Sequence, residues 1–144
     1  MKALAEIVEK LRESRAWLHE QLIDVKEEQM TLPVAGHTPR YVRAMFYLLI
    51  SHEAEHTVQL VKTLSALDLH QSEAQLILRS LQRSRGELEG LLLGLSDEDL
   101  DRAPAEGEWP PREVLAHIIA DEELLGKRIV EAIQQSETKS KPST

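Results

Sequence analysis

Hydrophobic residues recur along this chain at helical spacing in four long segments. Steps of three, four and seven residues place the apolar side chains of each segment on one face of a helix. The four segments span residues 3–28, 39–66, 72–95 and 110–135. No stretch alternates between apolar and polar residues over a useful length, so no strand is expected. The pattern therefore predicts an all-α protein.

The loops between these segments are marked by proline and glycine. Gly36 and Pro39 lie between the first two helices, and Gly107 and Pro110 lie between the last two. Thr38 is the expected N-cap of the second helix, because a proline follows it at the first helical position. The Ser-Asp-Glu-Asp segment that begins at residue 96 is expected to form a capped short turn of helix.

The two halves of the chain repeat each other. Residues Ile7, Leu11, Ser14, Arg15, Leu18, Leu22 and Val25 recur 70 positions later as Ile77, Leu81, Ser84, Arg85, Leu88, Leu92 and Leu95. Each half is then a helical hairpin, at about 3–66 and 71–135, and neither hairpin can bury both of its faces alone. We therefore expect one antiparallel four-helix bundle domain over residues 1–135, followed by a flexible tail over 136–144.

Composition excludes several classes of function. The net charge is −8, and a domain this acidic is a poor ligand for a phosphate backbone, so no nucleic acid is expected. Aromatic residues make up only 3%, too few for a surface that stacks bases. Cysteine is absent, so a metal site would use histidine and carboxylate. No signal peptide or membrane span is recognisable, and the expected location is the cytoplasm.

Histidines on the second and fourth helices are the candidate metal ligands. His52 and His56 are four residues apart on the apolar face of the second helix, so they lie one above the other. His117 and Asp121 have the same spacing on the last helix, where a buried carboxylate would need a partner. Antiparallel packing of these two helices would bring His117 within about a turn of His56. The alternatives to metal binding are that the histidines are core residues with ordinary hydrogen-bond partners and that Asp121 lies at the edge of the apolar face and reaches water.

Two other metal motifs pass through the same residues. Residues 52–56 match His-Glu-x-x-His, the helix of zinc proteases in which Glu53 would be the general base. An all-helical chain offers no strand to hold a peptide, which disfavours this function. Glu53 and His56 also match half of a di-iron bundle, but the last helix lacks a second Glu-x-x-His.

Residues 75–130 resemble the N-terminal half of the DinB-like (DinB/YfiT) four-helix metalloprotein family. The similarity rests on the Ser-Asp-Glu-Asp-Leu segment and then on Gly107, Trp109, Arg112, Glu113, Leu115, His117, Asp121 and Glu122. Residues 5–66 resemble the C-terminal half of the family, through a His-x-x-x-His-x-x-Gln-Leu motif made by His52, His56, Gln59 and Leu60. The two halves stand here in the order opposite to the family's, as in a circular permutation.

The resemblance implies a site of three histidines, His52, His56 and His117, that binds one divalent metal, Zn, Ni or Fe. Asp121 would be a fourth ligand or would orient His117. Three ligands leave positions open for water or substrate, so the family implies a metal-dependent enzyme of the thiol S-transferase or hydrolase type, with a low-molecular-weight thiol as substrate. The competing hypothesis is a non-catalytic bundle that acts by dimerisation or partner binding.

Three glycines suggest a second interface. Gly86, Gly90 and Gly94 are spaced four residues apart on the predicted third helix, where they would leave a flat face. Close approach of another helix across a homodimer is one interpretation, and tolerance of glycine on a solvated surface is the other. On the first interpretation the protein is expected to be a homodimer.

Overall fold

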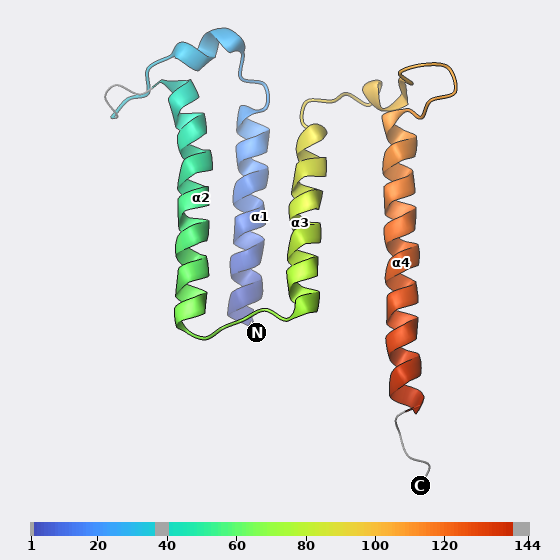
Figure 1. Ribbon diagram of the computed structural model, residues 1–144. Coiled ribbons are helices and arrows are strands. Elements are labelled where there is room, and N and C mark those ends of the chain that lie inside the picture. Colours follow the sequence, from blue (N-terminus) through green and yellow to red (C-terminus); the bar gives the residue numbers. More distant parts are fainter. Residues whose placement is uncertain (1, 37–40, 140–144) are drawn as a thin grey trace. The chain divides into compact units, whose positions relative to one another are not determined.

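The computed structural model describes residues 2–36 and 41–139, which form helices joined by turns (Figure 1). The α-helices are α1 (Lys2–Leu22), α2 (Val42–Ala66), α3 (Glu73–Leu91) and α4 (Pro111–Lys139), and two short 3₁₀ helices are η1 (Glu27–Thr31) and η2 (Asp99–Asp101). The described ranges contain no strand, only an isolated bridge between Pro33 and Tyr41. The all-α prediction is confirmed. No helix in these ranges is both long enough and apolar enough to cross a membrane.

The chain divides into two compact units, Met1–Gly94 and Leu95–Thr144. The first unit contains α1, η1, α2 and α3, and the second contains η2 and α4. In the first unit α1 and α2 run in opposite directions, joined by the segment that carries η1 (Figure 1). The predicted single domain over residues 1–135 remains a prediction.

The same order of elements occurs twice along the chain, once in each half, as the sequence repeat predicts; the pairing of α3 with α4 as a hairpin remains a prediction. Each half consists of an α-helix, a 3₁₀ helix, a loop and a second α-helix. Both loops contain a glycine in the left-handed region: Gly36 and Gly107 each have a φ of 80°. Glycine adopts this conformation at no steric cost, so the two loops share a backbone preference as well as a sequence position.

Two helices end earlier than predicted. The first ends at Leu22, where the chain turns. Lys26 then stands at the N-cap of η1, and Gln29 Oε1 accepts from its backbone N–H at 2.9 Å. The third ends at Leu91, so Gly94 lies beyond it with a φ of 79°. The expected stripe of three glycines on one helix is therefore wrong at Gly94, which serves the turn instead.

The other ends agree more closely. The second helix ends at Ala66 as predicted, whereas its proposed cap, Thr38, and the proline after it lie outside the described residues. The last helix continues to Lys139, so residues 136–139 of the predicted tail are helical.

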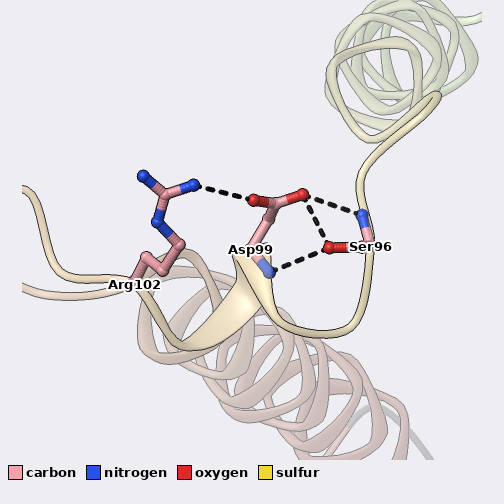
Figure 2. Close-up of polar contacts among 3 residues, drawn as sticks. All are labelled: Ser96, Asp99 and Arg102. Carbon is pink, nitrogen blue, oxygen red and sulfur yellow. Dashed lines mark hydrogen bonds and ion pairs between the residues drawn. The ribbon is translucent and has the colours of Figure 1, made fainter.

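Side-chain caps fix two of the helix starts. Ser72 Oγ accepts from the Gln75 backbone N–H at 3.3 Å, and Gln75 Oε1 accepts from the Ser72 N–H at 2.8 Å, which closes a capping box at the start of α3. The same reciprocal pattern joins Ser96 and Asp99 ahead of η2, and Arg102 donates to the other carboxylate oxygen of Asp99 at 3.1 Å (Figure 2). The predicted capped turn is confirmed.

Partly buried apolar side chains lie mainly on and around each 3₁₀ helix and the start of the α-helix that follows it. In the first unit the partly buried apolar side chains are Leu18, Leu22, Val25, Met30, Val34, Val42, Met45, Phe46, Leu48, Leu88 and Leu92. In the second unit they are Leu100, Pro110, Pro111, Leu115 and Ile118. None of the described residues is fully buried. These clusters include residues of the first turns of α2 and α4, the two helices that carry the candidate ligands.

Candidate metal centre

His52 and His56 face each other on the middle of α2. Their Nε2 atoms are 3.1 Å apart, and their rings meet edge to face with centroids 4.4 Å apart. Two nitrogens bound to one Zn²⁺ at about 2.0–2.1 Å lie about 2.8–3.4 Å apart when the angle between them is about 90–110°. The observed separation is in that range. The two rings therefore fit a pair of adjacent ligands to one ion, as the spacing of four residues predicts.

Gln59 contacts the far side of the His56 ring. Its Oε1 lies 2.7 Å from His56 Nδ1. An amide oxygen only accepts hydrogen bonds, so Nδ1 carries the proton and the Nε2 lone pair of a neutral His56 is free to bind a metal. A polar partner on the second ring nitrogen is usual for metal-binding histidines, because it fixes the tautomer and the orientation of the ring.

Glu53 is engaged elsewhere. Its carboxylate accepts a hydrogen bond from Arg15 of α1, and the two form an ion pair. Both side chains line an open groove of about 950 Å³ in the first unit (the α1–α2 groove), together with apolar residues such as Phe46, Leu49 and Leu22 and with Arg83 of α3. His52 and His56 do not line this groove. A protease mechanism needs Glu53 beside the metal, whereas here Arg15 holds it in the α1–α2 groove, which disfavours that mechanism further.

His117 and Asp121 also meet on one face of α4. His117 Nε2 lies 3.4 Å from Asp121 Oδ2, and each side chain is 54% exposed. The indole of Trp109, just before the helix, packs edge to face on the His117 ring with centroids 5.2 Å apart. The pair can supply two ligands, or one ligand with a carboxylate partner that orients it. Trp109 restricts the ring in either case.

An acidic and basic cluster fixes the start of α4, on which His117 depends. Arg112 donates from Nε to Asp101 Oδ1 at 2.6 Å and from Nη2 to Oδ2 at 3.0 Å, a bidentate pair. The hydrogen bond from Arg112 lowers the pKa of Asp101 below its ordinary value of 3.8. Hydrogen bonds from the backbone and hydroxyl of Ser96 lower the pKa of Asp99 in the same way. Arg112 is therefore committed to anchoring η2 against α4.

Two of the remaining histidines have surroundings of their own. His19 lines the α1–α2 groove, and His70 contacts Asp68 at 2.9 Å in the link between α2 and α3. Neither has a described contact with the His52–His56 pair. His37 lies outside the described residues.

The structure presents the four candidate ligands as two pairs in different units. His52 and His56 belong to Met1–Gly94, and His117 and Asp121 belong to Leu95–Thr144. Within residues 2–36 and 41–139, no group of three or more histidine or acidic side chains is gathered in a way that could hold a metal. The three-histidine site thus remains a prediction, whereas each pair is a structural observation.

Two contacts around the candidate ligands were not foreseen from the sequence. One is the packing of Trp109 on His117, and the other is the partnership of Arg15 with Glu53. Trp109 stands in the motif that ends at His117, and Arg15 stands in the repeated Ser-Arg pair, so both carried a signal. Their partners depend on loop geometry and on helix packing, which periodicity does not specify.

Comparison with known proteins finds a similarity in the second half of the chain. Residues 80–143 match the family model of the DinB superfamily. The match includes His117 and Asp121 and confirms the resemblance seen in the motif around them. It does not reach residues 5–66, so the permuted order of the two hairpins remains a prediction. No curated protein and no solved structure shows significant similarity to the chain.

Proposed function

We propose that this DinB-like chain binds one divalent metal ion, Zn, Ni or Fe, through His52, His56 and His117. Asp121 is either a fourth ligand or the carboxylate partner of His117. The observation that carries the proposal is the 3.1 Å approach of His52 Nε2 to His56 Nε2. Gln59 supports it, because its Oε1 accepts from Nδ1 and so places the lone pair of a neutral His56 on Nε2.

We further propose that the site is catalytic, of the thiol S-transferase or hydrolase type, with a low-molecular-weight thiol as substrate. A divalent ion with open coordination positions lowers the pKa of a water or thiol bound to it. The chain's own contribution is to orient the ligands: Gln59 holds His56, while Trp109 and Asp121 restrict His117. We also propose that the protein acts in the cytoplasm as a homodimer.

Metal analysis of protein prepared without a histidine tag tests the first proposal. We expect one ion per chain by elemental analysis, and Zn²⁺ titration of the metal-free protein should give the same stoichiometry. His52→Ala, His56→Ala and His117→Ala should each weaken binding at least tenfold. His70→Ala is the matched control, because this exposed histidine contacts only Asp68 among the interactions described, and it should bind as the wild type does.

The outcome separates the competing functions. A wild-type protein that binds no Zn²⁺, Ni²⁺ or Fe²⁺ would contradict the metal site and would leave the non-catalytic bundle, acting by dimerisation or partner binding. If His117→Ala binds as tightly as the wild type, the site consists of the α2 pair alone. For the thiol step, Co²⁺-loaded protein should develop a sulfur-to-metal charge-transfer band when a small thiol is added, and an unchanged spectrum would contradict it.

A further inference from the structure

We infer that Gln59 is a positioning residue, which sets the tautomer of His56 and thereby makes its Nε2 available to a metal. The metal in this inference rests on the proposed function, whereas the effect of Gln59 on the tautomer of His56 does not depend on it. His52, His56 and Gln59 form one chain of contacts along α2, with 3.1 Å between the two Nε2 atoms and 2.7 Å from His56 Nδ1 to Gln59 Oε1. Their spacing of four and then three residues keeps all three on one face of the helix.

The protons in this chain of contacts can be assigned from the donor and acceptor chemistry of each group. Gln59 Oε1 accepts, so His56 Nδ1 donates and, in the neutral ring, His56 Nε2 is an acceptor. The contact between the two Nε2 atoms then needs a donor, which is the Nε2–H of His52. A metal that takes both Nε2 atoms displaces this single proton, which can reside on Nδ1 of the same His52 ring.

Without Gln59 this assignment would be lost. A histidine free in water favours the proton on Nε2, and a His56 in that form offers its metal-binding nitrogen as a donor instead of a lone pair. The carboxamide of Gln59 reverses the preference through one short contact. Among the described residues, the hydrogen bond described for the Gln59 side chain is the one to His56, whereas Thr63 Oγ1 donates to the Gln59 main-chain oxygen at 3.0 Å, so a change of the side chain leaves the helix backbone intact.

The tautomer of His56 can be measured directly in metal-free protein. Two-bond ¹H–¹⁵N correlation spectra at pH 8 should show the Nδ1–H form for His56 in the wild type and the Nε2–H form in Gln59→Leu. Gln59→Glu should retain the Nδ1–H form, because a carboxylate also accepts from Nδ1. Gln82→Leu, an exposed glutamine-to-leucine change in α3, is the matched control and should leave the spectrum of His56 unchanged. Equal helix content by circular dichroism would show that the variants fold.

Zn²⁺ titration then links the tautomer to the metal. Gln59→Leu should bind Zn²⁺ about tenfold to a hundredfold more weakly than the wild type, the usual effect of removing a partner of a ligating histidine. Gln59→Glu should bind within a few-fold of the wild type. An Nδ1–H form that persists in Gln59→Leu, or an unchanged affinity, would overturn the role of Gln59. The tautomer is read without metal, so a wild type that binds no Zn²⁺ overturns the proposed function and not this assignment.

Discussion

An ion pair between Arg15 and Glu53 links α1 to α2, and a double-mutant cycle can measure its contribution to the free energy of unfolding. The cycle consists of the wild type, Arg15→Ala, Glu53→Ala and the double variant. Its coupling energy isolates the pair from the other effects of each substitution. The pair also occupies the groove side of α2, so these variants should leave Zn²⁺ binding by His52 and His56 within about twofold.

The size of the coupling follows from exposure. The Arg15 side chain is 51% exposed and that of Glu53 is 66% exposed, so water screens the charges strongly. Two unit charges about 4 Å apart attract by about 1 kcal/mol in bulk water. Ordering two long side chains offsets part of this attraction, so exposed pairs typically contribute about 0.2–1 kcal/mol. We expect a coupling in that interval at low salt and a smaller one in 1 M NaCl, where the Debye length is about 3 Å.

Urea unfolding followed by far-ultraviolet circular dichroism gives the four free energies of unfolding. The same cycle on Arg43 and Glu27, which join α2 to η1 with side chains 46% and 88% exposed, is a matched reference and should give a similar coupling. A coupling above about 2 kcal/mol, or one that 1 M NaCl does not reduce, would refute the argument from exposure. A coupling of zero at low salt would show that this contact does not join α1 to α2.

Four further substitutions test the local structure. Ser72→Ala removes the Oγ that caps α3 and should lower the free energy of unfolding by about 1 kcal/mol in urea titrations, and no change would contradict the capping box. Gly107→Ala should lower the free energy of unfolding by about 1–2 kcal/mol through its φ of 80° alone, since a Cβ there meets nothing within 4 Å. Gly126→Ala, inside α4, should instead raise the free energy of unfolding by about 0.5–1 kcal/mol. Equal effects of the two substitutions would refute the conformational argument. The hydrogen bond from Arg112 lowers the pKa of Asp101 on folding, so the ionised carboxylate stabilises the protein above pH 3.8, and this stabilisation is lost as the pH falls through the lowered pKa. Asp101→Asn should therefore lose less free energy of unfolding than the wild type between pH 5 and 2. Parallel profiles of the free energy of unfolding against pH would contradict the pairing.

Helix type and number could be predicted from the sequence, and a helix start could be predicted where a residue imposes a conformation. Pro111 opens α4 and Ser72 caps α3, both as their chemistry requires. The end of α1 at Leu22 carries no glycine or proline, and the apolar stripe runs on through Val25. Beyond Leu22 the Val25 N–H turns back to the Leu22 carbonyl, and Gln29 Oε1 accepts from the Lys26 N–H, local bonds that periodicity does not predict.

The candidate site was predictable where it lies on a single helix. A spacing of four residues on α2 is enough to bring His52 to His56, and the structure shows the contact. The convergence of His117 on that pair depends on how helices from the two halves pack, which neither spacing nor motif determines. The residues that contact each candidate ligand could be predicted in part. Gln59 is three residues from His56, so helix geometry predicts its contact, whereas Trp109 reaches His117 only through the conformation of the loop before α4.

The shared backbone conformation of the two loops lets one substitution be compared at two corresponding positions of the same molecule. Gly36 and Gly107 adopt the same φ of 80° in corresponding places, yet each is followed by its own helix and its own candidate ligands. A substitution made at one can be repeated at the other in the same chain, under the same solvent and temperature. Any difference between the two effects then measures what the surrounding half contributes, with the chemistry of the substitution held constant.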